Sequence, residues 1–559
     1  MLEHDCDVQF DESVLALLDR ENAERDEVTA VLNGRPREAP HPKTRSGIDT
    51  SRFPFGKLKT FQRRDLAHLL SLSHGANFSV PGAGKTAVTY AAYESERLRG
   101  RVTRALVVAP LSAFDAWTSE ADKWMRPAPV VRWLEDRIPA KCEVLLVNYQ
   151  RLSGRYDRIV EWITAQPTHV ILDEAHRIKS GKNGEWGAAC LGLALHAARR
   201  DILTGTPAPQ HPKDFLALLE FLWPNQSSRI LPSAAAAPHP SPDVMEQVSR
   251  RLRPFFVRTK KGELRLRPPK LQVELVEMKP LQAEIYETMR RRIRQTVSMT
   301  SRDRLLFSQL ADVVVYLMEA ATNPALLGPA LGGIERSRTV WPPSPIPEGS
   351  SLIDRVVNYT KYEMPRKFEK LATIVGKNAK LGRKTLVWSN FVTNLEDLAN
   401  RVLAPYKPAM IYGAIPSTQA ETAYRTRQTE LWRFRRDPEC MVLLANPAAM
   451  SEGVSLHEEC HDAIYLDRTF NAGQYLQSLD RIHRLGLAKG VDTRITFLVT
   501  TGTIDETIDR RVRLKAERLS QMLSDPDLLV MAMPDIGDYG EWVDTDDLDG
   551  LFAHLSIDE

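Results

Sequence analysis

Short apolar runs alternate with amphipathic segments along most of the chain. Beyond residue 51 the first series comprises ALVVAP (105–110), VLLVNY (144–149), HVILDEAH (169–176) and DILTGTP (201–207). The second series comprises KTLVWSN (384–390), CMVLLAN (440–446), DAIYLD (462–467) and TRITFLV (493–499). Continuous apolar runs that are bounded by turn residues and separated by helical segments are typical of parallel strands buried on both faces. The pattern therefore predicts an α/β protein with two parallel-sheet lobes.

Changes in composition divide the chain into five segments. They are a charged N-terminal extension at 1–50, lobe 1 at 51–270 with an insertion at about 226–250, a helical protrusion with a Pro/Gly-rich linker at 271–360, lobe 2 at 361–525, and an acidic tail at 526–559. In the extension, Phe10, Val14, Leu17 and Leu18 recur at helical spacing. This spacing predicts one amphipathic helix there.

The composition is that of an ordinary globular protein with several domains. Of the 559 residues, 43% are hydrophobic and 26% are charged, which excludes a wholly disordered chain and a disulfide-stapled miniprotein. The five cysteines are scattered and never in CxxC spacing, which favours reduced thiols over a structural zinc module. The chain has no apolar window long enough to span a membrane, and its first residues, MLEHDCDVQFDE, are acidic where a signal peptide is basic. We therefore expect no membrane partner and a cytoplasmic location.

The net charge of +3 hides a strong asymmetry. From Asp525 onward the chain holds 11 acidic residues and neither Lys nor Arg, so the remainder carries an excess of 14 basic side chains. A basic body suits a polyanion partner such as DNA. Within the tail, Leu548, Leu551, Phe552 and Leu555 recur at helical spacing. The tail is interpreted either as a solvated end or as an element that docks a protein partner or competes for the basic surface.

The segment SVPGAGKT, Ser79 to Thr86, is a candidate phosphate loop because it follows an apolar stretch and precedes a helical one. Its glycines allow tight turns whose N–H groups face phosphate oxygens, and Lys85 can neutralise the β- and γ-phosphates. The Thr86 hydroxyl can ligate Mg²⁺. The residues expected to bind the nucleotide are Pro81, Gly82, Ala83, Gly84, Lys85 and Thr86. The alternative is a glycine turn before a helix.

The tetrapeptide Asp173-Glu174-Ala175-His176 follows the apolar strand VIL. A carboxylate at the end of a parallel strand can hold Mg²⁺ through water, which is the role predicted for Asp173. The adjacent Glu174 can orient and deprotonate an attacking water. The alternative, a solvated helix start, does not explain why the tetrapeptide ends a predicted strand. Together with the phosphate loop, it predicts ATP hydrolysis.

A third motif, QSLDRIHRLG at 477–486, lies in the second series of strands. Arg481 and Arg484 are three residues apart, so that on a helix or tight turn they share a face. A guanidinium from a second lobe that reaches the γ-phosphate stabilises transition-state charge. By itself the motif would be an ordinary surface arginine pair. With the other two motifs it predicts catalytic arginines.

These motifs resemble those of the Swi/Snf-type ATPases (Snf family) of helicase superfamily two, which carry a DEAH box. The further matching segments are LKTFQRRDL (58–66), VVAPLSAFDAW (107–117), LTGTP (203–207), RLRPFFVRTKKGELRLRPPK (251–270), MKPLQAEIY (278–286), NPALL (323–327), TLVWSNF (385–391) and MSEGVSL (450–456). The resemblance runs in order over some 450 residues. It implies two RecA-like lobes with helical insertions between them, which close on ATP and Mg²⁺ and track along double-stranded DNA.

The resemblance also implies roles for residues that spacing alone does not assign. Gln62 is expected to read adenine, and Gly453 to belong to the nucleotide site. The residues expected to couple hydrolysis to movement or to contact DNA are Ser112, His176, Thr204, Thr206 and Gln477. Departures from the family pattern are Leu111, Ser455 and Leu487, together with the segment 209–212, which lacks the usual asparagines. They affect the expected DNA contacts and the coupling of the lobes rather than the ATP chemistry.

Four other features have open interpretations. The cluster 457–461 (HEECH) could bind a metal or simply join a motif to a strand, and adjacent Cys460 and His461 do not easily point at one ion. The run 250–270 holds nine basic residues against one acid, and is either a phosphate track or solvated surface. Tyr149 either approaches DNA or is a buried strand-end aromatic. Trp388 is expected in the core of lobe 2.

The leading hypothesis is an ATP-driven double-stranded DNA translocase that displaces or remodels DNA-bound complexes. A strand-separating helicase is one alternative. Another is a motor subunit of a multi-protein repair or restriction-like defence complex, with the N-terminal extension or the acidic tail as its contact to a protein partner. Arg outnumbers Lys by 53 to 22, which favours a GC-rich genome and a compact bacterial member located in the cytoplasm on the nucleoid.

Overall fold

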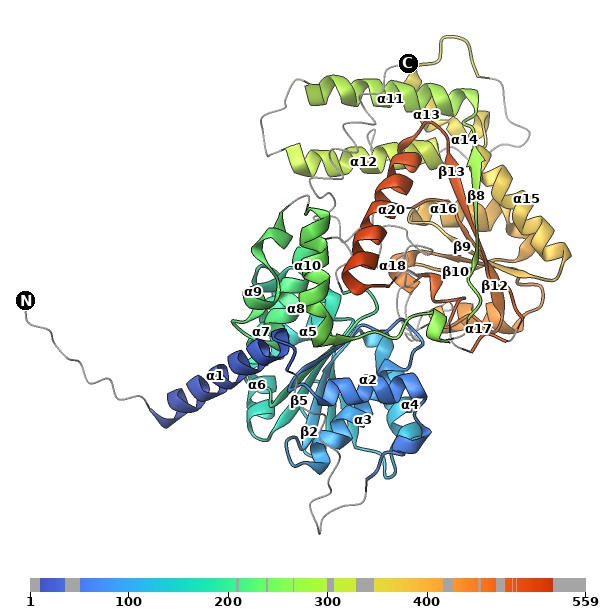
Figure 1. Cartoon of the computed structure of the whole chain (residues 1–559). Coiled ribbons are helices and arrows are strands. Elements are labelled where there is room, and N and C mark those ends of the chain that lie inside the picture. The colour runs from blue at the N-terminus through green and yellow to red at the C-terminus, as the bar shows by residue number, and fades with distance from the viewer. Residues whose placement is uncertain are drawn as a thin grey trace, which may run out of the picture. The chain divides into compact units, whose positions relative to one another are not determined.

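Two parallel sheets organise the chain, one in each of the two units into which it divides (Figure 1). The computed structural model describes residues 11–35, 51–207, 211–237, 240–264, 266–298, 306–327, 346–415, 426–450, 454–468, 478–484, 486–488 and 490–525. Among these, the first unit holds the residues up to Glu263 together with Gln521–Asp525, and the second holds Leu264–Ser520. We call them lobe 1 and lobe 2 and describe each by itself. The second unit thus contains both the segment expected as a helical protrusion and linker, 271–360, and most of the expected lobe 2, 361–525.

The sheet of lobe 1 has seven parallel strands in the order β3-β4-β2-β5-β6-β1-β7. The strands are β1 (Gly75–Asn77), β2 (Arg104–Val108), β3 (Val131–Trp133), β4 (Val144–Val147), β5 (Thr168–Asp173), β6 (Arg199–Leu203) and β7 (Phe256–Val257). Asp173 at the end of β5 pairs with Leu203 at the end of β6, which in turn pairs with Asn77 at the end of β1. Because the strands are parallel, the loops that leave these three strands meet at one edge of the sheet.

Helices cover this sheet where the sequence shows amphipathic segments. They are α2 (Thr60–Leu70), α3 (Lys85–Leu98), α4 (Phe114–Trp124), α5 (Tyr149–Leu152), α6 (Tyr156–Thr164), α7 (Glu185–Ala194), α8 (Phe215–Leu222), α9 (Ser227–Ile230) and α10 (Pro242–Leu252). The core combines the apolar residues of β2, β4 and β5 with aromatic side chains of α3 and α4. Ser241 caps α10 by accepting a hydrogen bond from the N–H of Val244, and Pro242 occupies the first helical position.

The N-terminal extension contributes helix α1 (Glu12–Leu32), which packs on lobe 1 through its second half. Val28 and Val31 are buried, and Glu24 forms an ion pair with the buried Arg200 at the start of β6. A buried guanidinium needs such a partner, since an uncompensated charge in the interior is costly. The contact therefore fixes α1 at the amino-terminal edge of the sheet.

The apolar residues that predicted this helix do not form its packing face. Val14, Leu17 and Leu18 are exposed, and Phe10 lies outside the described residues. The helix was therefore predicted correctly, but its buried side was not. Its contacts are made further along, where the sequence alternates apolar and charged residues.

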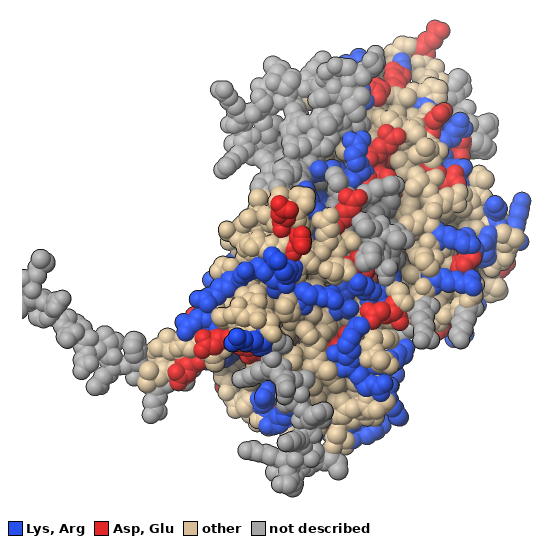
Figure 2. Space-filling view, in the orientation of Figure 1, with Lys and Arg blue, Asp and Glu red and all other residues tan. Residues whose placement is uncertain are grey.

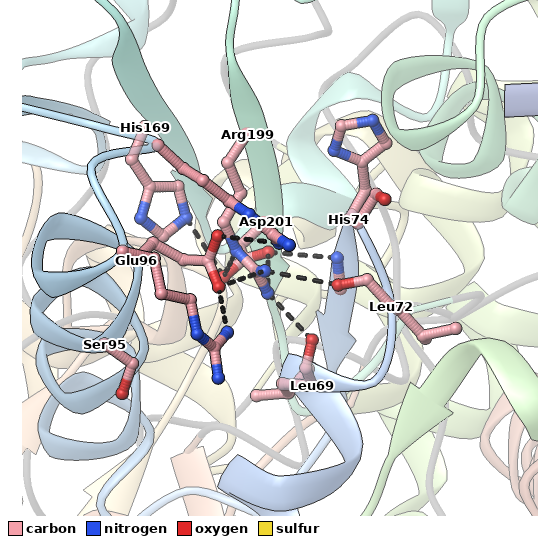
Figure 3. A network of polar contacts seen from close by, with 12 residues as sticks. Leu69, Leu72, His74, Ser95, Glu96, His169, Arg199 and Asp201 are labelled. Atoms are coloured by element: carbon pink, nitrogen blue, oxygen red, sulfur yellow. Dashed lines mark hydrogen bonds and ion pairs between the residues drawn. The ribbon is translucent and has the colours of Figure 1, made fainter. Parts of the chain in front are cut away.

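A buried polar network joins the amino-terminal ends of β1, β5 and β6 (Figure 3). Arg199 donates to the carbonyl oxygen of Leu69 at 2.9 Å and forms an ion pair with Asp201 at 3.1 Å. Asp201 accepts a hydrogen bond from the N–H of Gly75 at 2.9 Å and lies 3.0 Å from His169 Nε2. Because Arg199 and Asp201 are almost fully buried and bind backbone groups of Leu69 and Gly75, the network fixes the turn from α2 into β1. It lies at the edge opposite to the loops that follow the strands.

The sheet of lobe 2 has six parallel strands in the order β10-β11-β9-β12-β13-β8. They are β8 (Lys270–Val276), β9 (Lys384–Trp388), β10 (Ala409–Ile411), β11 (Val442–Ala445), β12 (Cys460–Tyr465) and β13 (Arg494–Thr500). Trp388 is fully buried at the end of β9, as expected. Strand β8 falls in the segment that we expected to be a helical protrusion, and it pairs with β13 along its whole length.

The helices of lobe 2 include those of the helical protrusion that was expected between the two series of strands. They are α11 (Pro280–Ser298), α12 (Leu306–Thr322), α13 (Leu352–Val357), α14 (Tyr359–Tyr362), α15 (Arg366–Lys380), α16 (Val392–Asp397), α17 (Arg427–Arg436), α18 (Pro447–Met450) and α20 (Ile504–Leu523). Gln282 of α11 donates to the carbonyl oxygens of Ala320 and Ala321 in α12, at 3.0 and 2.9 Å. Tyr286 accepts from the N–H of Ile504, which begins α20. In the described part of the chain, no helix is both long and apolar enough to cross a membrane.

Candidate functional site

The phosphate-loop candidate connects β1 to α3 at the carboxyl edge of the lobe 1 sheet. Gly82 and Gly84 both have φ of +84°, a conformation that side chains other than glycine adopt only with strain. Gly84 is the N-cap of α3, and no side chain caps this helix. The first N–H groups of α3 are therefore available to an anion, and the helix dipole favours negative charge at this point.

Gln62 holds the loop from the side of α2. Its Oε1 accepts from the N–H of Lys59 at 3.0 Å, and its Nε2 donates to the carbonyl oxygen of Ala83 at 3.1 Å. A Cβ at Gly84 would overlap the amide nitrogen of Gln62, so the contact requires glycine there. The structure thus brings Gln62 to the phosphate loop. The expected reading of adenine by this residue stays a prediction.

Two residues that the sequence analysis did not single out also brace the loop. Asp65 accepts hydrogen bonds from the hydroxyls of Thr259 at 2.6 Å and Ser79 at 3.3 Å. The hydroxyl of Ser79 accepts in turn from the N–H of Thr259 at 3.0 Å. Asp65 lies three residues after Gln62, and both occupy the buried face of α2 together with leucines. A polar residue at an apolar position of an amphipathic helix was the signal that could have identified Asp65.

Lys85 and Thr86 begin α3, as the phosphate-loop pattern predicts. The Lys85 ammonium donates to the carbonyl oxygen of Ser79 at 3.0 Å, so that it lies folded over the loop. Thr86 is partly exposed at the second position of the helix. The two side chains are thus placed where a triphosphate and its metal ion would meet the helix N-terminus.

The Asp-Glu pair sits at the end of β5 in a tightly held conformation. The carboxylate of Asp173 accepts from the indole N–H of Trp117 at 2.9 Å and from the N–H of Glu174 at 3.0 Å. Tyr149 donates its hydroxyl to the carbonyl oxygen of Asp173 at 2.8 Å. Of the two interpretations of Tyr149, an aromatic that approaches DNA or one buried at a strand end, the second is therefore correct. Glu174 has φ of +51°, so that its side chain and that of Asp173 leave the strand in different directions.

Burial, together with the neighbouring charge of Glu174, raises the pKa of Asp173 to about 6. The Trp117 hydrogen bond and the positive charge of Lys85 act in the opposite direction. A carboxylate in this environment gains from a cation, since a nearby positive charge favours its ionised form. Mg²⁺ typically binds to one or two carboxylates in addition to water and phosphate oxygens. Asp173 and Thr86 fit such a site.

His176 and the threonines of LTGTP come together, as their expected coupling role requires. His176 Nδ1 lies 3.1 Å from the hydroxyl of Thr204 and 3.5 Å from a carboxylate oxygen of Glu174. The N–H of Thr206 donates to the Thr204 hydroxyl at 3.2 Å. Burial lowers the pKa of His176 to about 3, so the imidazole is neutral at pH 7. The strand-end motifs of β5 and β6 thus form one hydrogen-bonded unit. Ser112 is exposed at the other side of β2, in the turn before α4.

The basic run 250–270 is not a continuous phosphate track. Arg258 and Lys261 are buried, Arg265 lies outside the described residues, and the boundary between the lobes interrupts the run. Arg258 donates to the carbonyl oxygens of Phe78 at 2.5 Å and of Gly205 at 3.1 Å. Its guanidinium also pairs with Asp525 at 2.6 Å. Arg258 therefore ties the phosphate loop and the LTGTP segment to the end of α20, a role that charge counting could not reveal.

In lobe 2, the described parts of MSEGVSL (450–456) and of QSLDRIHRLG (477–486) pack against each other. Arg481 is nearly buried, and it donates to the carbonyl oxygen of Val454 at 3.0 Å. Gly486 has φ of +111° and lies so close to the ring of His457 that a Cβ there would overlap it. Burial and the positive charge of Arg484 lower the pKa of His457. The delivery of Arg481 and Arg484 to the nucleotide stays a prediction.

The remaining site candidates are Gly453, Gln477 and the segment 457–461. Gly453 and Gln477 lie outside the described residues. His457 Nδ1 lies 2.6 Å from the hydroxyl of Ser455, the residue that departs from the family pattern. Among the described residues, no group of three or more His, Cys, Asp or Glu side chains is arranged to hold a metal ion. The 457–461 segment follows MSEGVSL and runs into β12, which begins at Cys460.

Comparison with known proteins agrees with the order of these motifs. The SNF2-related domain matches residues 62–326, and the Helicase conserved C-terminal domain matches residues 366–486. The chromatin structure-remodeling complex subunit snf21 of Schizosaccharomyces pombe is 26% identical over 83% of this chain and 39% of its own length. The transcription regulatory protein SNF2 of Saccharomyces cerevisiae is 25% identical over 83% of this chain and 27% of its own length.

The likeness to solved structures is weaker. The Sulfolobus solfataricus SWI2/SNF2 ATPase core in complex with dsDNA is 20% identical, with a TM-score of 0.37 over 86% of this chain and 96% of that one. The chain spans between about a quarter and two fifths of the length of the two curated relatives above.

Proposed function

We propose that this chain, which belongs to the Snf2 family of ATPases, is a motor that hydrolyses ATP to move along double-stranded DNA and to displace or remodel DNA-bound complexes. The observation that carries the proposal is the meeting of three motifs at one edge of the lobe 1 sheet. The phosphate loop, the Asp-Glu pair and the LTGTP segment follow β1, β5 and β6 and share hydrogen bonds there. Residues proposed to bind the triphosphate are thereby linked by hydrogen bonds to residues that can respond to its hydrolysis.

In this proposal the triphosphate lies on the N-terminus of α3, with Lys85 on the β- and γ-phosphates. Mg²⁺, held by Thr86 and by Asp173 through water, would neutralise phosphate charge. Glu174 orients a water molecule towards the γ-phosphorus and takes its proton, so that ADP and phosphate are formed. Arg481 and Arg484 complete the site by stabilising the charge of the transition state.

The proposed DNA partner is supported by the charge of the chain and by its surface. In Figure 2, Lys and Arg side chains gather in a band over the part of lobe 1 where α10 ends. Arg229, Arg250 and Arg253 are exposed there, and within the described part of the chain none of them takes part in an ion pair. Arg229 and Arg250 border a recess of about 520 Å³ beside the end of α1. Unpaired arginines of this kind suit the phosphates of a nucleic acid.

The decisive experiment compares ATP turnover without nucleic acid and with duplex DNA, single-stranded DNA or RNA. We expect Mg²⁺-dependent turnover that duplex DNA stimulates and that Lys85→Ala abolishes. Glu174→Gln should bind ATP but hydrolyse it at least a hundredfold more slowly, because the loss of a general base typically costs 10²–10⁴-fold, by order of magnitude. Turnover that is indifferent to every nucleic acid would contradict the proposal.

A second assay separates translocation from strand separation. A translocase displaces the third strand of a DNA triplex but leaves a forked duplex paired. Efficient unwinding of the fork would replace our proposal by the helicase alternative. Low turnover alone, rising only with a co-purifying protein, would favour the motor-subunit alternative.

A further inference from the structure

We propose that Trp117 is a positioning residue for the metal-dependent step of ATP hydrolysis, because its indole N–H fixes the carboxylate of Asp173 relative to the phosphate loop. The proposal rests on the metal-binding role proposed above for Asp173. Trp117 lies at the end of VVAPLSAFDAW, and no role for it follows from the sequence pattern. Its Nε1 donates to Asp173 Oδ2 at 2.9 Å.

The carboxylate of Asp173 is oriented by donors on both of its oxygens. Oδ2 accepts from Trp117, and Oδ1 accepts from the N–H of Glu174 at 3.0 Å. Each oxygen of an ionised carboxylate can accept about two hydrogen bonds, so each keeps a lone pair for water or a hydrated cation. The two donors therefore fix the direction of the remaining lone pairs without occupying them.

Trp117 is itself held by the helix that starts at the phosphate loop. Its ring meets that of Tyr90 edge to face, with 5.3 Å between the ring centroids. The Tyr90 hydroxyl donates to the carbonyl oxygen of Trp117 at 3.0 Å. Tyr90 lies on α3, five residues after Lys85. A continuous set of contacts thus runs from α3 through Trp117 to Asp173, and it sets the spacing between Thr86 and the carboxylate.

A purely structural role for Trp117 makes a different prediction. The side chain is 1% exposed and belongs to the core of lobe 1. If Trp117 acted only by filling space, any polar group could serve as the hydrogen-bond partner of its N–H. The proposed role requires that the partner be Asp173 and that loss of the N–H alone change the response to Mg²⁺.

The test removes the N–H with the least change of shape. The first variant is Trp117→Phe, and the second has β-(3-benzothienyl)alanine at position 117, which keeps the bicyclic ring and replaces N–H by sulfur. The matched control is Trp124→Phe on the same helix, whose indole donates to Glu120 Oε2 at 2.8 Å, away from Asp173. Circular dichroism and melting temperature establish that each protein is folded.

Two readouts are measured on the full chain. The first is the Mg²⁺ concentration that gives half-maximal ATPase activity. The second is the affinity for a fluorescent ADP analogue with Mg²⁺ and with EDTA, which needs no turnover. Because a hydrogen bond to a charged group is worth roughly a tenfold change in an equilibrium constant, we expect the Mg²⁺ requirement to rise about tenfold in both Trp117 variants. The gain in ADP affinity that Mg²⁺ brings should shrink by a similar factor, and the affinity in EDTA should not change.

Either of two results would overturn the proposal. One is a wild-type Mg²⁺ response in a folded benzothienylalanine variant. The other is an equal loss of ADP affinity with and without Mg²⁺, which would mark Trp117 as structural only. Because the ADP measurements do not involve DNA, a failure of DNA stimulation would leave this test intact, and the two proposals can fail separately.

Discussion

The buried ion pair between Arg258 and Asp525 leads to the sharpest prediction for the stability of lobe 1. Both side chains have no exposed surface, and Asp525 is the last described residue of the chain. Replacing Asp525 by alanine leaves the Arg258 guanidinium buried with two carbonyl partners, those of Phe78 and Gly205. We expect this change to destabilise lobe 1.

The magnitude follows from the environment of the pair. Removing one partner of a buried ion pair costs about 3–5 kcal/mol, because the other charge stays desolvated. Replacing both partners by apolar residues costs less, so the double variant Arg258→Met/Asp525→Leu should be more stable than the sum of the single changes predicts. The carbonyl oxygens of Phe78 and Gly205 would then lack a donor, which limits the recovery.

Hydrogen exchange measured by mass spectrometry reports on lobe 1 separately. Peptides that contain Phe78 and β7 should lose protection in Asp525→Ala, because the N–H of Phe78 donates to Val257 at 2.8 Å beside the pair. The matched control is Glu439→Ala, which breaks the exposed pair with Lys407 in lobe 2 and should leave these peptides unchanged.

A pair of truncated chains gives the same test without a point substitution. A chain that ends after Asp525 should keep full protection of these peptides, and one that ends after Ser520 should lose it. The reasoning is refuted if Asp525→Ala and the shorter chain both exchange like the wild type, since removing the carboxylate partner of a buried guanidinium is costly.

Three further predictions concern the nucleotide site. Lys85→Ala should lower ATP turnover by at least a hundredfold, as measured by phosphate release, whereas Glu174→Gln should keep ATP affinity and lose turnover to a similar extent. Gly84→Ala should weaken nucleotide binding in an equilibrium titration, because φ of +84° costs a side chain about 1–2 kcal/mol and the new Cβ would overlap a neighbouring amide. The raised pKa of Asp173 stabilises the fold at low pH. In EDTA, the contribution of Asp173 to the free energy of unfolding should therefore be lost as pH rises from 3.8, the ordinary pKa of an aspartate, through about 6. Asp173→Asn should remove this loss in melting curves taken across that range. Burial lowers the pKa of His176 to about 3, so this residue acts in the opposite direction: its contribution to the free energy of unfolding is lost as pH falls from the ordinary value of 6.5 towards 3.

The strands and the motifs at their ends could be predicted from sequence because parallel strands buried on both faces leave an uninterrupted apolar signal. The seven residues of β8 gave no such signal, because an edge strand has one open side: Leu271, Val273 and Leu275 remain exposed. Resemblance to a family then placed Gln62, Lys85, Asp173 and Glu174 in one site, and the geometry of lobe 1 brings them to the same edge of the sheet.

What sequence could not predict depends on which neighbour a polar side chain meets. In the sequence, Arg258 is one of nine basic residues in a run that could lie on the surface, but in the structure it is buried. Its burial could not be predicted because its partners at Phe78, Gly205 and Asp525 are distant in sequence. Trp117 looked like part of a family motif, and only the fold shows that its N–H reaches a carboxylate 56 residues away. Such contacts are set by long-range packing and leave no periodic pattern.

The chain crosses between the two lobes twice. Among the described residues the backbone passes from lobe 1 to lobe 2 after Glu263 and returns after Ser520. Lobe 1 is therefore completed only by residues that follow all of lobe 2 in the sequence, so a chain cut anywhere before Gln521 lacks part of lobe 1. Arg258 is not alone in holding this segment, because Lys260 donates to the carbonyl oxygen of Ser524 at 2.6 Å and Leu523 is buried.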